Sequence, residues 1–237
     1  HAQNAHGSFS ASPQHARKIT GNPYLDLFYN LRAKAILVVE FEGETIEAAR
    51  KAVETAFEGV KNSLRKSFPK GYDEEKLAWD LRRHTSPILN RLDDGKITIK
   101  PLWAVEDVSL PPETFIAYVR EQKALFEKHG LICSCFGHAA SCNLHIDPVG
   151  VDPRKAREEE AVAQLYDLVA EESYALTIKH GGSIAGEHGD GFTRTPFLAW
   201  QYLEAHKLFS LFKNLFDTKA LLNPGKVVPD TRRRTYV

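Results

Sequence analysis

The sequence predicts an α+β fold in which helices pack on one face of an antiparallel sheet. Two apolar segments, residues 131–136 and 144–149, are typical of strands, and their connection is too short for a parallel crossover. Longer segments with apolar residues at helical spacing alternate with the predicted strands. A short strand-to-strand connection among amphipathic helices favours an α+β layer arrangement.

The first half of the chain contains one predicted strand and two predicted helices. Residues 35–41 are an apolar run that we expect to form a mostly buried strand. Thr45 is a suitable N-cap for a helix that we expect to continue to about residue 66. Residues 73–90 form the second predicted helix, and residues 97–108 are expected to be extended.

Three further helices are predicted in the second half. Proline is tolerated in a first helical turn, so the proline pair at 111–112 predicts a helix start, and Gly130 is a typical end signal. Residues 153–179 and 197–216 have the apolar spacing of two more helices.

Composition excludes several classes of function. The chain is 43% hydrophobic and 26% charged, and its 31 basic and 31 acidic residues cancel, which argues against a nucleic-acid partner. The longest apolar run, residues 35–39, is far shorter than the roughly 20 residues of a membrane-spanning helix. Three closely spaced cysteines fit a reducing compartment. We expect a cytoplasmic protein, with peripheral attachment to the inner membrane as the alternative.

We expect one globular domain between two short terminal segments. Residues 1–22 are rich in polar and small residues and are expected to be poorly ordered, and residues 230–237 are expected to be a solvated basic tail. The sequence contains no methionine, so we expect a fragment, a processed product or one subunit of a split protein.

The segment connecting the two central strands carries a pair of histidines. His138 and His145 are seven residues apart, and a turn at residues 140–142 would let both imidazoles point to the same place. Imidazole suits a divalent metal ion, so a metal pair is the functional interpretation. The alternative is two unrelated loop histidines, because the spacing is not that of a zinc finger.

A second motif, residues 186–191, reads Gly-Glu-His-Gly-Asp-Gly. Its glycines allow positive φ angles and close approach of a ligand to the backbone. Glu187 could provide a third metal ligand, and His188 would then lie near the substrate as a base. The alternative is a purely structural turn. A carboxylate substrate would also need a cation, for which Arg82 and Lys100 are candidates, although each could be an ordinary surface residue.

Five segments together resemble the C-terminal (cap) domain of FAD-linked oxidases of the vanillyl-alcohol oxidase and p-cresol methylhydroxylase superfamily, in the D-2-hydroxyacid dehydrogenase branch. The resemblance covers residues 24–229, and residues 191–198 are similar to long relatives that carry iron–sulfur domains. The five segments are 79–82 (Trp-Asp-Leu-Arg), 105–111 (Val-Glu-Asp-Val-Ser-Leu-Pro), 136–145, 186–191 and 222–226 (Leu-Asn-Pro-Gly-Lys).

This resemblance implies a role for each candidate residue, with residues 23–229 as the cap domain. It implies that His138, His145 and Glu187 bind a divalent metal ion, zinc first, with manganese or iron as alternatives. It implies that His188 accepts the proton of the substrate hydroxyl and that Arg82 binds the substrate carboxylate. Hydride would pass to FAD, giving oxidation of a D-2-hydroxy acid to a 2-oxo acid.

Two departures from the family pattern bear on these expectations. The family has a small glycine-containing run between its histidines, whereas this chain has Ala140, Ser141 and Cys142, whose Cβ atoms restrict the turn. Asp147 stands where the long relatives often have an arginine, which reverses a charge and leaves the substrate open.

The FAD-binding domain of the family has no counterpart in this sequence. We therefore expect FAD to be bound mainly by another domain or subunit, with an iron–sulfur domain or subunit as a further partner. Two other functions remain open from the residues alone. One is a metal-dependent module that binds a small carboxylate without redox activity, and the other is a metal-dependent hydrolase that uses the same ligands.

Overall fold

The structure is a computed structural model, and it separates into two compact units, His1–Leu92 and Asp93–Val237. Three sequence predictions concern residues outside the described ranges and are not tested by the structure: the role of Lys100 and the terminal segments 1–22 and 230–237. The residues that it describes are 35–61, 69, 71–89, 105–149 and 159–229.

The described part of the first unit consists of two helices, α3 (Ile46–Gly59) and α4 (Tyr72–Leu89). The predicted cap is confirmed, because the backbone N–H of Ala48 donates to Thr45 Oγ1 at 3.1 Å. The predicted strand at 35–41 is wrong for the described structure. Those residues have no regular secondary structure and most are exposed, since no described strand pairs with them.

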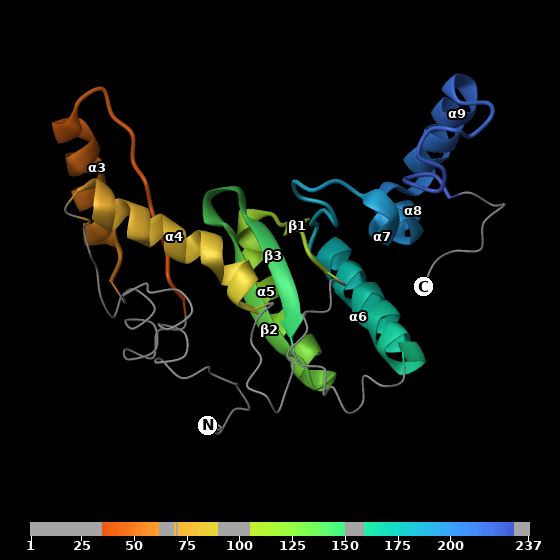
Figure 1. Cartoon of the computed structure of the whole chain (residues 1–237), viewed down its shortest axis with the longest axis horizontal. Coiled ribbons are helices and arrows are strands. Elements are labelled where there is room, and N and C mark those ends of the chain that lie inside the picture. The colour runs from red at the N-terminus through yellow and green to blue at the C-terminus, as the bar shows by residue number, and fades with distance from the viewer. Residues whose placement is uncertain (1–34, 62–68, 70, 90–104, 150–158, 230–237) are drawn as a thin grey trace. The chain divides into compact units, whose positions relative to one another are not determined.

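The second unit contains an antiparallel sheet with the order β1-β3-β2 (Figure 1). Its strands are β1 (Val108–Ser109), β2 (Ile132–His138) and β3 (Asn143–Val149). A single 3-10 turn, η1 (Ala139–Ser141), joins β2 to β3, and the register pairs His138 with Asn143. The predicted α+β class and the antiparallel strand pair are therefore confirmed.

Two long helices, α5 (Pro112–Lys128) and α6 (Glu159–Lys179), pack against each other, and α5 packs on β2. Alternation along β3 directs Leu144 and Ile146 into this helical layer and His145 to the opposite face. The helices thus provide the hydrophobic core and leave the other face of the sheet for polar side chains. The core is formed by Val105, Val108, Leu110, Tyr118, Phe126, Leu131, Leu144, Ile146, Val169, Ala170, Tyr174, Ile184 and Leu198.

The predicted helix at 197–216 is wrong as one continuous element. The structure has α8 (Leu198–Tyr202), η3 (Leu203–Ala205) and α9 (His206–Phe216) in its place, preceded by α7 (Gly191–Arg194) and η2 (Thr195–Phe197). Leu203 has a φ of 48°, in a region that a non-glycine helical residue does not occupy, so the path must break there. Periodicity could not reveal this break because apolar residues occur at helical spacing on both sides of it.

Among the helices in the described ranges, none is both long enough and apolar enough to cross a bilayer.

Candidate metal centre

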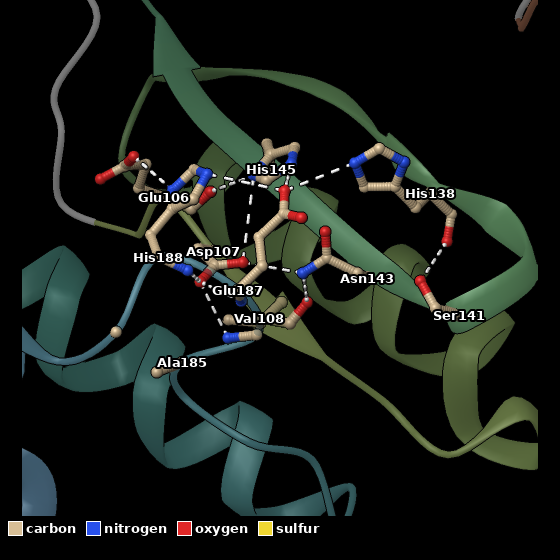
Figure 2. Close-up of polar contacts among 12 residues, drawn as sticks. Glu106, Asp107, Val108, His138, Ser141, Asn143, His145, Ala185, Glu187 and His188 are labelled. Carbon is tan, nitrogen blue, oxygen red and sulfur yellow. Dashed lines mark hydrogen bonds and ion pairs between the residues drawn. The ribbon is translucent and has the colours of Figure 1, made fainter.

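Three side chains converge where the β2–β3 hairpin meets the 186–188 turn. Figure 2 shows Glu187 pointing from this turn toward His138 and His145 on the hairpin. Glu187 Oε1 lies 2.9 Å from His145 Nε2 and 3.4 Å from His138 Nε2. One ligand atom from each residue lies within 4.8 Å of the others, so a single ion could contact all three.

The hairpin register brings the two histidines together. His138 pairs with Asn143, and His145 follows Asn143 by two residues, so all three side chains lie on one face of the sheet. The tight turn needs a left-handed residue, and Cys142 adopts it with a φ of 50°. The Cβ at this position therefore does not prevent the turn. The left-handed conformation costs a non-glycine residue about 1 kcal/mol.

Asp107 holds the 186–188 turn against the sheet. Its fully buried carboxylate accepts the backbone N–H groups of Gly186, Glu187 and His188 at 2.8, 2.9 and 2.8 Å. The Asn143 side chain donates to its other oxygen at 2.7 Å. Burial acts to raise the pKa of Asp107, but these hydrogen bonds outweigh it and hold the pKa below its ordinary value.

The close approach of this turn requires glycine at position 186. A Cβ added to Gly186 would lie 2.1 Å from Asn143 Nδ2 and 2.6 Å from Asp107 Oδ1. No side chain fits there unless the turn moves away from Asp107, which would also displace Glu187.

The hydrogen bond of His145 defines which of its nitrogens can bind an ion. Its Nδ1 lies 3.2 Å from the backbone oxygen of Glu106, which can only accept, so Nδ1 carries the hydrogen. Nε2 then presents a lone pair toward Glu187 Oε1. With Nδ1 protonated, the 2.9 Å approach of Nε2 to Glu187 Oε1 is favourable when Nε2 also carries a proton or when a metal ion contacts both atoms.

His188 stacks on His145, with ring centroids 4.8 Å apart and an interplanar angle of 12°. Its Nδ1 lies 2.8 Å from Glu106 Oε1, and its Nε2 lies 3.6 Å from Glu187 Oε1. Asp107, His145 and His188 form a second possible ligand group. One ligand atom from each of them also lies within 4.8 Å of the other two. The Asp107 oxygens are already occupied by N–H donors, so the group with Glu187 is better suited to an ion.

The model of one protein family, FAD linked oxidases, C-terminal domain, matches residues 9–227. The chain belongs to this family. It is 36% identical over 138 residues to D-2-hydroxyglutarate dehydrogenase of Escherichia coli (strain K12), covering 58% of this chain and 13% of the relative. The chain is 30% identical over 208 residues to glycolate oxidase subunit GlcD of Bacillus subtilis (strain 168), a match that covers 85% of this chain and 41% of the relative.

D-lactate dehydrogenase of Archaeoglobus fulgidus is 33% identical to the chain over 129 residues, which cover 54% of this chain and 27% of the relative. The matches to these three relatives therefore cover between 13% and 41% of the relatives' lengths. The predicted resemblance to the FAD-linked oxidase C-terminal domain of 2-hydroxyacid dehydrogenases is confirmed, and this family implies FAD as a cofactor.

Neither of the two predicted substrate cations belongs to the described part of the second unit. Arg82 lies half-buried in α4 of the first unit, whereas the clustered residues lie in the second. Lys100 lies outside the described residues. Their contacts with a substrate stay predictions.

Three residues that position the site were missed as site residues by sequence reasoning. Glu106 and Asp107 belong to the 105–111 motif that supported the resemblance, but nothing in that motif indicates partners about 80 residues away. Arg194 is buried and donates from Nε to the Ile184 oxygen at 2.7 Å and from Nη1 to the Gly189 oxygen at 2.9 Å. It therefore supports both ends of the turn that carries Glu187.

Proposed function

We propose that this chain is the substrate- and metal-binding part of a flavin-dependent dehydrogenase that oxidises a D-2-hydroxy acid to a 2-oxo acid. Its membership of the FAD-linked oxidase C-terminal domain family supports the reaction class. The names of three relatives, D-2-hydroxyglutarate dehydrogenase, glycolate oxidase subunit GlcD and D-lactate dehydrogenase, support the substrate class.

The observation that carries the proposal is the convergence of three lone-pair donors, His138 Nε2, His145 Nε2 and Glu187 Oε1. Nitrogen and oxygen ligands of zinc lie about 2.0–2.2 Å from the ion, so two ligands of one tetrahedral ion lie about 3.4 Å apart. The separation of 3.4 Å between Glu187 Oε1 and His138 Nε2 matches this geometry, and the 2.9 Å separation from His145 Nε2 would widen slightly when the ion binds. We propose zinc, with manganese or iron as alternatives.

The exposure of the ligands supports a catalytic rather than a structural ion. His145 is buried, while the side chains of His138 and Glu187 are 54% and 46% exposed. An ion held by two histidines and one glutamate keeps an open position on this exposed side for a substrate oxygen. When bound, the metal would acidify the substrate hydroxyl and FAD would take up the hydride.

The chain's own residues would then hold the substrate and accept its proton. His188 lies beside the ligands with Nε2 3.6 Å from Glu187 Oε1, in reach of a hydroxyl bound next to that carboxylate. Arg82 and Lys100 would bind the substrate carboxylate. We propose that FAD is held by another domain or subunit and that an iron–sulfur domain or subunit is a further partner. We also propose that the protein is cytoplasmic or peripheral to the inner membrane.

The test is metal stoichiometry of the purified chain, measured by elemental analysis and by zinc titration calorimetry. We expect one zinc per chain, and a loss of affinity of at least tenfold in His138→Ala, His145→Ala and Glu187→Gln. The matched controls, His206→Ala and Glu171→Gln, should bind zinc like the wild-type chain. Full zinc binding by the ligand variants would contradict the proposal.

The redox part needs the chain together with an FAD-binding domain. We expect D-2-hydroxy acids to bleach the flavin absorbance under anaerobic conditions and His188→Gln to slow the bleaching by about a hundredfold or more. Zinc binding without any flavin reduction would favour the non-redox carboxylate-binding module.

A further inference from the structure

Glu106 touches both histidines at the centre of the site, but it touches none of the three proposed ligand atoms. We propose that Glu106 is a positioning residue, whose side chain fixes the tautomer of His188 so that Nε2 presents its lone pair to the substrate. This inference rests on the proposed role of His188 as the proton acceptor.

The side-chain contact defines where the ring hydrogen lies. Glu106 Oε1 lies 2.8 Å from His188 Nδ1, and an ionised carboxylate can only accept a hydrogen bond. In a neutral imidazole one nitrogen carries the hydrogen and the other carries the lone pair, so a hydrogen on Nδ1 leaves Nε2 free to accept a proton. The opposite tautomer would aim the Nδ1 lone pair at the carboxylate.

The rest of the His188 residue is already held by other contacts. Its backbone N–H donates to Asp107 Oδ2, and its ring stacks on His145. The location of the backbone and the ring plane therefore do not depend on Glu106. What the carboxylate adds is the choice between the two tautomers and between the two flips of the ring.

The same residue also fixes the second histidine, but through its main chain. The backbone oxygen of Glu106 lies 3.2 Å from His145 Nδ1. A substitution of the Glu106 side chain leaves this carbonyl in place. The tautomer of His145 is therefore an internal control for the effect on His188.

Solvent limits how strongly the Glu106 carboxylate can bias the tautomer of His188. The side chains of His188 and Glu106 are 43% and 38% exposed, so water competes for both partners. A hydrogen bond to a charged group at such a site still shifts a two-state equilibrium by about tenfold. We expect the ratio of the Nδ1–H to the Nε2–H tautomer of His188 to fall by this factor when the carboxylate is removed.

The test is long-range ¹H–¹⁵N correlation NMR of the metal-free 237-residue chain with ¹⁵N-labelled histidine. The spectra are recorded about two pH units above the ordinary imidazole pKa, and His188→Gln identifies the signal. We expect the Nδ1–H tautomer in the wild-type chain, its loss in Glu106→Ala and its rescue in Glu106→Gln, whose amide oxygen still accepts. Glu113→Ala, an exposed glutamate in α5, should change nothing.

Zinc titration of the same variants separates this inference from the proposed function. We expect Glu106→Ala to bind zinc within about threefold of the wild-type affinity, because its side chain contacts no proposed ligand. An unchanged His188 tautomer in Glu106→Ala would overturn the inference, as would a loss of zinc affinity or a changed His145 tautomer. A wild-type chain that binds no zinc would overturn the metal site, while the tautomer result would still decide the role of Glu106.

Discussion

Asp107 is the residue on which the geometry of the site depends most. It is fully buried, and it joins the turn that carries Glu187 to the strand that follows the turn of the hairpin. The sequence placed Asp107 in a motif but could not assign its role, because its partners are the backbone amides of residues 186–188. Every residue type except proline has a backbone N–H, so residue identity does not reveal such partners, whereas the proposed metal ligands could be named from their side chains.

We expect Asp107→Asn to lower the free energy of unfolding by about 3 kcal/mol. One carboxylate oxygen accepts three N–H groups and the other accepts the Asn143 amide, so an amide nitrogen in either place puts donor against donor. Urea unfolding measures the loss. Asp167→Asn, on the exposed face of α6, should change it by less than about 0.5 kcal/mol.

At the scale of elements, the site is a hairpin closed by a glycine turn. Both were predictable, because the two strands are apolar and closely spaced and the glycines permit the turn. The break of the C-terminal helix at Leu203 was not predictable. Leu203 has a φ of 48°, a region for which leucine has no preference, so its residue type gives no sign of the break.

We expect Gly186→Ala to weaken zinc binding by at least tenfold. The added Cβ would overlap Asn143 and Asp107, so the turn must shift and carry Glu187 away from the histidines. Zinc titration calorimetry checks this. The matched control is Gly59→Ala in α3, where a Cβ meets nothing within 4 Å, and wild-type affinity in Gly186→Ala would contradict the account of the turn.

The end of α9 gives the chain a pH-dependent contribution to stability. The Lys213 ammonium and the Leu221 and Leu222 backbone N–H groups lower the pKa of Asp217 from 3.8 to about 2, although burial acts to raise it. Because the folded-state pKa is lowered, this contribution is present above about pH 4 and is lost as the pH falls toward 2.

We therefore expect the stability difference between the wild-type chain and Asp217→Asn to shrink as the pH falls through this range. Urea unfolding at a series of pH values between about 5 and 2 measures it. A difference that stays constant with pH would contradict the assigned hydrogen bonds.

At the scale of the whole molecule, the helical layer provides the hydrophobic core, and the opposite face of the sheet carries the proposed metal ligands. The sequence predicted helices on one face of the sheet, and in the structure the alternation along residues 144–146 places leucine and isoleucine on that face and histidine on the other. The hydrophobic pattern could not predict the state of residues 35–41. An apolar run indicates a strand only if a partner strand is available, and pairing is a property of the whole chain.

We expect Phe126→Ala to lower the free energy of unfolding by about 3–5 kcal/mol while leaving the zinc affinity of the folded chain unchanged. Phe126 is fully buried in the hydrophobic core, and its side chain is not one of those that form the proposed metal site. Ile116→Ala on the same helix, at a position that is 58% exposed, is the control and should cost much less. A parallel loss of zinc affinity would show that core and site are not separable.

The most direct test of the metal centre is anomalous diffraction from crystals of the chain grown with zinc. We predict a single strong peak on the hairpin, about 2.0–2.2 Å from His138 Nε2, His145 Nε2 and Glu187 Oε1. No peak at saturating zinc, or a peak held by Asp107 and His188 instead, would contradict the account.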